Sequence, residues 1–577
     1  MRSCDIVRYA LGASYRGGDK RGPDATGARP SCRGQQPLAV RRLQPLSRQP
    51  TAGPHGCGAA SSSGRHKRRL VVVQHVVQFA SGVCRRQRLC RGQWSANAEA
   101  HDSGANGLHP FLPRRRLHLL LLGSELYGGT PGLVATALWC FCPIVLGHGA
   151  LVTPDVAAAS MGVAACYLFW RWLGEPTWSW ALAAGGGLGL AELTKFTWLI
   201  LFAAWPLTAL IVAAIRSFSG LRAAGKSPTD AAMIATFQRP VSTAAQLAAM
   251  LSLAVFVINV GYGFSGSCGR LGDQRFVSRL FKGSEEGRDE RDYGRHNRFA
   301  GTWLKSARIP LPGDYVLGID VQRRDFEAAM PTFFRGAWRE SAPWYAYLYG
   351  LAIKLPLGTL CVLILAAVDR LVRRGGARDE FVLLFPALVL LAVACGHTGL
   401  NSQVRYVLPA LPFLFIWAAK SARGFAVGRR RIAWLAAFAL AWSVAATLYN
   451  HPHHLSYFNE LCRWPRTAPP PLLDSNLDWG QDLVYLREWS KRHPETRPLR
   501  VACYASFEPA DLGIDCLPAA DVCDGQPGEN QPPGGWYALS LGELWGRGGR
   551  FAYFRRLEPV AVVGTTIHIY HLTRDEK

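Results

Sequence analysis

The sequence predicts a mainly α-helical, polytopic membrane protein that ends in a small α/β domain outside the membrane. Eight long apolar stretches lie between Asp155 and Asn450, alternate connections between them are rich in Lys and Arg, and no such stretch follows Asn450. The chain of 577 residues is 49% hydrophobic and only 18% charged, averages that a soluble protein could also have. The distribution of apolar residues therefore decides the class.

The eight apolar stretches predict membrane-spanning helices. A helix needs about 20 residues to cross roughly 30 Å of hydrocarbon, and several of the stretches reach that length. A buried core helix is the alternative for any single short stretch, but eight in series without an amphipathic period favour membrane spans. The approximate bounds are Val156–Leu173, Trp180–Leu193, Thr197–Ile215, Val241–Phe264, Trp344–Val368, Phe381–Cys395, Val404–Ala419 and Ile432–Leu448.

The short loops predict the orientation. Three of them carry four, four and five Lys or Arg residues and a fourth carries none; these are Arg216–Pro240, Asp369–Glu380, Lys420–Arg431 and His397–Gln403. The positive-inside rule assigns the basic loops to the cytoplasm. Counting spans from them predicts that Asp155, Lys195, the connection 265–343 and the C-terminal region lie outside.

Residues 1–120 differ in composition from the rest of the chain. They carry 19 Arg and 2 Lys against 4 Asp and 1 Glu, so 16 of the 25 net positive charges lie there. The segment shows no signal peptide or first span, and Leu117–Leu122 is too short to cross a membrane. A disordered basic tail and a nucleic-acid-binding arm are alternatives, but no aromatic interleaving supports nucleic acid as a partner. We favour translation from a wrong reading frame or start of a GC-rich gene, with the membrane pattern beginning at Ser124.

Two ionisable residues stand at predicted helix ends. Asp155 follows Thr153-Pro154, which suits helix initiation, and it is equally an ionisable group at a membrane boundary that faces a cavity. Lys195 ends the run Glu192-Leu-Thr-Lys. It either extends to the interface or neutralises a phosphate. His148 lies a few residues before Asp155 and is a further polar candidate.

Arg405 and Tyr406 follow a polar stretch at another predicted helix mouth. An Arg there is placed to hold a phosphate with two parallel hydrogen bonds, although packing or interface anchoring is the alternative. Tyr345 belongs to a group of aromatic residues that suits either an interfacial belt or sugar stacking. Lys354 lies within a predicted span, where an ammonium needs a partner or a path to the interface.

After the last span, the chain predicts a domain from residue 451 to 577. The run Asp474-Ser-Asn-Leu-Asp478-Trp-Gly-Gln-Asp482 could bind carbohydrate hydroxyls or cap a helix. The preceding histidines lack the spacing of a closed metal site, and a divalent metal stays open. Three cysteines allow one disulfide or free thiols. The predicted elements are a helix at Leu483–Arg492 and strands at Leu499–Ala505, Trp536–Leu541 and Val562–Leu572.

Several of these motifs resemble bacterial membrane glycosyltransferases of the GT-C superfold, in the protein O-mannosyltransferase and lipid A aminoarabinose transferase group. The resemblance covers roughly Ser124–Leu572. Its more specific motifs are Arg405-Tyr406-Val-Leu-Pro and Asp474-Ser-Asn-Leu-Asp-Trp-Gly-Gln-Asp, while Thr-Pro-Asp155 and Leu-Thr-Lys195 are weaker. The family's principal acidic motif, which follows its first span, has no counterpart in residues 1–120.

The resemblance implies a GT-C-like helical bundle in a bacterial inner membrane, at residues 124–450, with an extracytoplasmic α/β domain. It implies transfer of a sugar from a polyprenyl-phosphate donor to a lipid, glycan or protein acceptor. A secondary transporter and a non-catalytic membrane relative are the alternatives. The expected roles are catalysis for Asp155, donor-phosphate binding for Lys195, Arg405 and Tyr406, and substrate binding for His148, Tyr345, Lys354 and Asp478.

Overall fold

The computed structural model describes most of the chain after residue 111. The described residues are 112–151, 153–223, 230–283, 297–372, 377–396, 402–425, 428, 430–462, 464, 468–505, 508–519 and 532–573. The predictions made for residues 1–111 lie outside this part.

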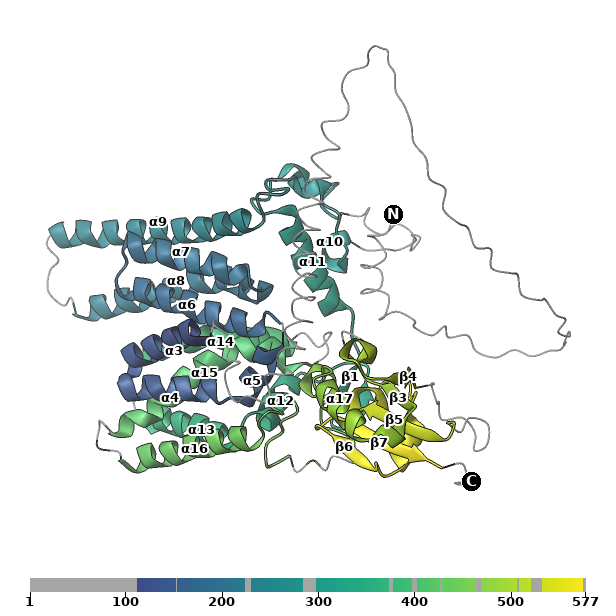
Figure 1. Cartoon of the computed structure of the whole chain (residues 1–577). Helices are drawn as coiled ribbons and strands as arrows, with labels where there is room; N and C mark the ends of the chain where they lie inside the picture. The colour runs from purple at the N-terminus through teal and green to yellow at the C-terminus, as the bar shows by residue number, and fades with distance from the viewer. Residues whose placement is uncertain are drawn as a thin grey trace, which may run out of the picture. The chain divides into compact units, whose positions relative to one another are not determined.

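The first and larger part is a bundle of helices that run side by side (Figure 1). In chain order they are α3 (Leu112–Tyr127), α4 (Gly129–Cys140), α5 (Pro143–Ala150), α6 (Asp155–Gly174), α7 (Trp178–Glu192), η1 (Phe196–Leu199), α8 (Ile200–Ala223), α9 (Asp230–Gly261), α12 (Ala346–Lys354), α13 (Leu357–Val372), α14 (Ala377–Gly396), η4 (Val404–Ala410), α15 (Leu411–Ala419), η5 (Lys420–Phe425) and α16 (Arg430–Tyr449). Among the described residues, five helical segments are long and apolar enough to cross a membrane, or up to seven if each of two bent helix pairs forms one span. The described part is thus mainly helical with several candidate spans, as the sequence predicts.

Two of the predicted spans are interrupted by proline. The stretch Trp344–Val368 forms α12 and α13, which are bent by 114°, because Pro356 lacks the N–H that a continuous helix requires. The stretch Val404–Ala419 begins as the 3-10 helix η4, and α15 starts only at Leu411. A third stretch, Trp180–Leu193, forms the 15-residue helix α7, which is shorter than a full span.

The first described helix overlaps the segment 1–120 of anomalous composition. Helix α3 starts at Leu112, and its residue Leu119 is buried at 1% exposure. Arg114–Arg116 directly precede the apolar run Leu117–Leu122. Because the run is short and follows three charged residues, a search for long apolar stretches does not find this helix. Residues 112–120 are therefore part of a helix whose start the search for long apolar stretches did not predict.

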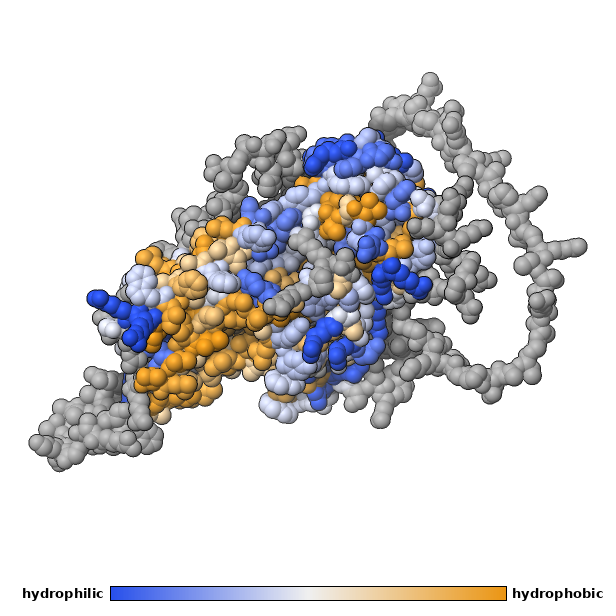
Figure 2. Space-filling view, turned by 90° about the horizontal axis from the view of Figure 1, so that it is seen from below, coloured by the Kyte–Doolittle hydropathy of each residue, from blue (hydrophilic) through white to orange (hydrophobic). Residues whose placement is uncertain are grey.

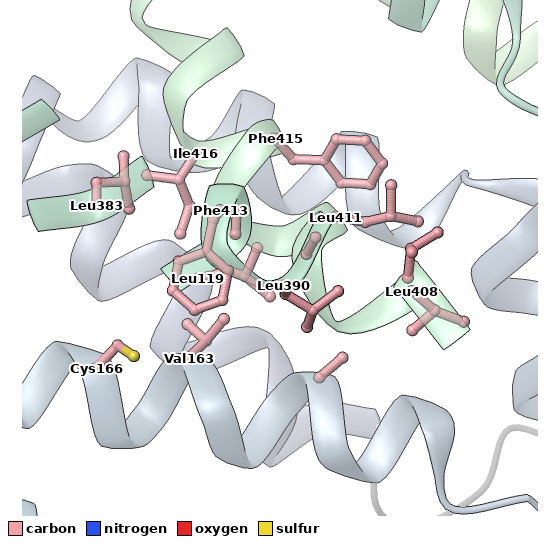
Figure 3. Close-up of a cluster of buried hydrophobic side chains, with 14 of the residues drawn as sticks. Leu119, Val163, Cys166, Leu383, Leu390, Leu408, Leu411, Phe413, Phe415 and Ile416 are labelled. Carbon is pink, nitrogen blue, oxygen red and sulfur yellow. The ribbon is translucent and has the colours of Figure 1, made fainter. Parts of the chain in front are cut away.

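The core of the bundle surrounds α15. Side chains of α3, α6, α14 and η4 converge there on Phe413, Phe415 and Ile416, which are all almost fully buried (Figure 3). Small residues allow close helix approach elsewhere. A Cβ at Gly185 of α7 would lie 2.5 Å from the carbonyl oxygen of Met250 in α9, so these two helices pack with their backbones nearly in contact.

The outward surface of the bundle is apolar. Figure 2 shows hydrophobic residues gathered over one region of the molecule, next to hydrophilic regions. Exposed side chains on α13 and α16 include Ile364, Leu435 and Phe438, each more than half exposed. Such a contiguous exposed apolar surface is typical of contact with lipid.

The connection 265–343 and the C-terminal domain carry the remaining elements. These are η2 (Leu271–Asp273), α10 (Arg279–Lys282), η3 (Trp303–Ser306), α11 (Gly313–Glu327), β1 (Thr332–Phe334), β2 (Ala337–Arg339), η6 (Asp474–Asn476), α17 (Leu483–Arg492), η7 (Pro494–Thr496), β3 (Leu499–Ala502), η8 (Pro509–Leu512), β4 (Cys516–Pro518), β5 (Gly535–Ser540), α18 (Leu541–Leu544), η9 (Ala552–Arg556), β6 (Ala561–Val563) and β7 (Ile567–Leu572). The hairpin β1–β2 is antiparallel. The main sheet has the order β4-β3-β5-β7-β6, in which β3 is parallel to β4 and β5, and β7 is antiparallel to β5 and β6.

The structure refines the predicted elements of the C-terminal domain. Helix α17 has the predicted bounds. The predicted strand Val562–Leu572 is two antiparallel strands, because Gly564 adopts a φ of +62° and turns the chain between them. Cys503 and Cys516 are free thiols, and Cys523 lies outside the described residues.

Candidate functional site

Asp155 and Lys195 form a partly buried ion pair at one end of the bundle. The Lys195 ammonium donates a hydrogen bond of 2.5 Å to Asp155 Oδ1. Asp155 is the first residue of α6, after Pro154, and is 1% exposed. Lys195 lies in the extended break between α7 and η1. The N-terminal end of a helix favours a carboxylate, so both the local helix start and the distant lysine stabilise the charge on Asp155.

The packing of Trp198 brings Lys195 to Asp155. The Trp198 indole donates a hydrogen bond of 2.9 Å to the carbonyl oxygen of Ala158, one turn along α6 from Asp155. Its ring lies against Gly162, where any Cβ would overlap it. A fully buried tryptophan three residues after Lys195 therefore sets the register between η1 and α6.

Arg405 also lies close to the Asp155 carboxylate. Its Nη1 atom lies 3.8 Å from Asp155 Oδ2, an ion-pair distance that is too long for a hydrogen bond. Its Nε atom donates a hydrogen bond of 2.8 Å to the Gln403 side chain. The Arg405 and Lys195 side chains are 20% and 19% exposed, whereas that of Asp155 is 2% exposed. Both cations thus reach the surface of the cluster, and the carboxylate lies beneath them.

Aromatic rings surround the two cations. The Arg405 guanidinium lies 5.2 Å from the centre of the Tyr406 ring and 5.0 Å from that of Trp479. The Lys195 ammonium lies 5.4 Å from the Tyr406 ring. A cation within about 6 Å of an aromatic face is attracted to it. Of these residues, Trp479 belongs to the C-terminal domain, so the cluster joins three regions that are distant in the sequence.

Among the described residues, Lys195 and Arg405 both lie within ion-pair distance of the single Asp155 carboxylate. Burial lowers the pKa of the Lys195 ammonium from its usual value, and the charge of Asp155 opposes that shift. An excess positive charge in a partly buried site favours an anionic ligand. Arg405 presents a planar fork of donors that fits a phosphate, and Lys195 presents a compact charge.

Lys354 and His148 lie in a neighbouring part of the bundle, where both are buried. The Lys354 ammonium donates hydrogen bonds of 2.7 Å to the carbonyl oxygen of Leu455 and 2.8 Å to that of Tyr457. It also faces the Phe458 ring at 4.3 Å. Lys354 thus anchors the segment that follows α16. A small cavity beside it is lined by Ile144, His148, Lys354, Val404, His454, Leu455 and Tyr457.

Tyr345 lies in a separate aromatic group. Its ring contacts Phe334 at 5.8 Å and Trp344 at 5.6 Å, where the connection 265–343 enters α12. The structure therefore places Tyr345 among hydrophobic neighbours and not in the ion cluster.

Asp478 is buried in the C-terminal domain at 3% exposure. Its Oδ1 atom accepts a hydrogen bond of 2.9 Å from the Gly480 N–H. Burial raises the pKa of Asp478 to about 7, and the nearby Asp482 carboxylate adds to this shift. The residue that reaches the ion cluster is its neighbour Trp479, which the sequence analysis did not single out. The sequence feature that could have identified Trp479 is its position as a large aromatic residue between Asp478 and Asp482, next to a glycine.

The histidines 451, 453 and 454 do not form a metal site within the described chain, where no cluster of three His, Cys, Asp or Glu residues could hold an ion. His453 instead lies 3.6 Å from Asp482 Oδ1. Desolvation lowers the pKa of His454 to about 4, so that imidazole is neutral at physiological pH.

Comparison with known proteins gives one similarity. Residues 117–222 match the model of a family described as dolichyl-phosphate-mannose-protein mannosyltransferases. The matched stretch contains Asp155 and Lys195 and ends long before Arg405. No curated protein and no solved structure matches the chain significantly.

Proposed function

We propose that this chain is a membrane glycosyltransferase that moves a sugar from a polyprenyl-phosphate donor to an acceptor hydroxyl on the extracytoplasmic face of a bacterial inner membrane. The observation that carries the proposal is the convergence of Lys195 and Arg405 on Asp155, with both cations partly exposed. The similarity of residues 117–222 to a mannosyltransferase family supports the same class of reaction.

In this mechanism Lys195 and Arg405 bind the donor phosphate. The bond between the anomeric carbon of the sugar and the phosphate oxygen breaks, and the electron pair stays on the phosphate. Fixed positive charges at the position where negative charge develops lower the barrier. Tyr406 and Trp479, whose rings flank Arg405, restrict the orientation of its guanidinium.

Asp155 is the proposed base. The acceptor oxygen forms the new bond to the anomeric carbon, and its proton passes to the Asp155 carboxylate. Lys195 donates a hydrogen bond to that carboxylate. A bound phosphate competes for Lys195 and leaves an oxygen of Asp155 available for the acceptor. His148, Tyr345, Lys354 and Asp478 stay candidates for substrate binding. Of these, Lys354 acts through the segment Leu455–Phe458 that it anchors.

A secondary transporter is the second candidate. Interrupted helices are common in transporters, where they form the substrate site. Here α4 and α5 are bent by 53° and α12 and α13 by 114°. The break at Pro356 follows Lys354 by two residues. A substrate that binds at this break would lie near a cation, so the transporter alternative implies an anionic substrate.

The test is transfer of label in membranes that contain the chain. Membranes are incubated with radiolabelled polyprenyl-phosphate sugars, and the products are separated into lipid, glycan and protein fractions. The expected result is label in one acceptor fraction, which Asp155→Asn, Lys195→Ala and Arg405→Ala each reduce. The exposed Lys491, paired with Glu488 in α17, supplies the control Lys491→Ala. Label that crosses the membrane without changing its chemical linkage would instead support transport.

A further inference from the structure

The loop 473–482 of the C-terminal domain is attached directly to the segment that carries Arg405. The Asn476 side chain accepts a hydrogen bond of 2.8 Å from the Val404 N–H and donates one of 3.2 Å to the Ser402 carbonyl oxygen. Asn476 is 4% exposed. The buried side-chain amide of Asn476 thus pairs with two backbone groups just before Arg405. Its oxygen accepts one hydrogen bond and its NH₂ group donates the other.

The same loop presents Trp479 to the guanidinium of Arg405. The backbone N–H of Trp479 donates a hydrogen bond of 2.8 Å to the side-chain oxygen of Gln481. The next residue, Gly480, has a φ of +80°, and a Cβ there would lie 2.7 Å from Ala505 Cβ. Only glycine fits this turn without strain. The turn therefore fixes the backbone on both sides of the Trp479 ring.

The far end of the loop is anchored in the sheet. Asp482 Oδ2 accepts hydrogen bonds from the backbone N–H and hydroxyl groups of Thr565 and Thr566, in the turn between β6 and β7. The carboxylate packs against Gly564, where a Cβ would overlap it. The loop is consequently a rigid connection between the sheet and Arg405.

We propose that Asn476 and Trp479 are positioning residues of the phosphate site, through which the C-terminal domain holds Arg405 in the orientation that binds the donor. This inference rests on the proposed function, because it assigns the phosphate of the donor as the ligand of Arg405. An arginine side chain loses conformational freedom when it binds an anion. A guanidinium that already contacts two aromatic rings loses less, so the domain raises the affinity of the site through Arg405.

The test measures binding and catalysis in the full chain, reconstituted in nanodiscs. The binding probe is radiolabelled polyprenyl phosphate without a sugar, and the donor KM and kcat are measured separately. Trp479→Ala is expected to raise the Kd of the probe and the donor KM about tenfold, with a smaller effect on kcat. Trp479→Phe keeps a ring beside Arg405 and is expected to recover most of the affinity. Asn476→Ala is expected to act in the same direction.

A tryptophan elsewhere in the domain supplies the matched control. Trp489 in α17 stacks on His493 at 4.4 Å, so Trp489→Ala removes an equally large ring without touching Arg405. The control is expected to leave the Kd of the probe unchanged. An equal loss of affinity in Trp479→Ala and Trp489→Ala would reduce the effect to domain stability and overturn the inference.

A double-mutant cycle with Arg405→Ala separates this inference from the proposed function. If Trp479 acts through Arg405, Trp479→Ala has no further effect on the Kd in the Arg405→Ala background. Additive effects overturn the positioning role while leaving Arg405 as a phosphate ligand. If Arg405→Ala alone leaves the Kd unchanged, the phosphate role of Arg405 fails, and the positioning role fails with it.

Discussion

The Lys195 ammonium lies 2.5 Å from Asp155 Oδ1, although 40 positions separate the two residues in the chain. A carboxylate in this position has two consequences. Its charge orients Lys195 and opposes the effect of burial on the Lys195 pKa, and we expect a bound phosphate to compete with it for Lys195. The predictions below test both consequences and the packing that produces the pair.

Removal of either cation is expected to weaken donor binding. Lys195→Ala and Arg405→Ala each delete a charge-assisted contact with the phosphate, so kcat/KM for the donor should fall by about 10- to 100-fold. Steady-state transfer assays with labelled donor measure the effect. Arg547→Ala, which removes a half-exposed partner of Glu340, is the control and should retain full activity. Unchanged kcat/KM in both site variants would contradict the assigned phosphate contacts.

Neutralisation of Asp155 is expected to separate catalysis from binding. Asp155→Asn removes the proton acceptor, and kcat should fall by about 100-fold or more. The same change removes the negative charge that competes with the phosphate for Lys195. The bound phosphate then supplies the charge that opposes the effect of burial on the Lys195 pKa, so the Kd for polyprenyl phosphate should not rise. Parallel measurement of kcat and Kd distinguishes a role of Asp155 in catalysis from a role in binding. A large rise in Kd with a normal kcat would assign Asp155 to binding alone.

Stability is expected to fall between about pH 4 and pH 7 because of Asp478. Burial raises the pKa of this carboxyl from 3.8 to about 7, so over this range the folded state keeps a proton that the unfolded state has released. The free energy of unfolding then falls as pH rises, by up to about 1.4 kcal/mol per pH unit. Thermal unfolding at pH 5 and pH 7, followed by tryptophan fluorescence, measures this loss.

Asp478→Asn should reduce the difference in the free energy of unfolding between pH 5 and pH 7, since the amide does not ionise. The neighbouring Asp482 acts in the opposite direction, because the His453 side chain and the N–H and hydroxyl donors of Thr565 and Thr566 hold its pKa below the usual value against the effect of burial. Its stabilisation is lost only as pH falls below about 4, outside the measured range. An Asp478→Asn variant that keeps the full difference would assign the effect to another group.

Substitution of Gly162 is expected to disturb the site through Trp198. A Cβ at Gly162 would overlap the indole, so Gly162→Ala should lower the free energy of unfolding by about 1–3 kcal/mol and displace Lys195 from Asp155. Gly186→Ala in α7 is the matched control, because a Cβ there meets no atom within 4 Å. The midpoint of thermal unfolding and the donor KM should change in the first variant only. Equal behaviour of the two variants would show that the indole can move at little cost.

The sequence alone predicted the features that depend on local composition. Long apolar runs predicted the helices α6, α8, α9, α14 and α16, because the length of an apolar run and the hydrocarbon thickness are both local quantities. Trp489 and its neighbours predicted α17 with its observed bounds. The same reasoning did not anticipate the start of α3 at Leu112 behind three arginines.

Only the tertiary structure decided which of the polar candidates meet. From the sequence, Asp155 was also compatible with helix initiation, Lys195 with extension to the interface, and Arg405 with packing or interface anchoring. Their contact depends on the Trp198 indole against Gly162 and on η4 packing against α6. Trp479 entered the cluster and Asp478 did not, because the turn at Gly480 directs one side chain to Arg405 and buries the other. Such contacts join residues that are far apart in the chain, and their energies arise only when the helices pack, so no local pattern encodes them.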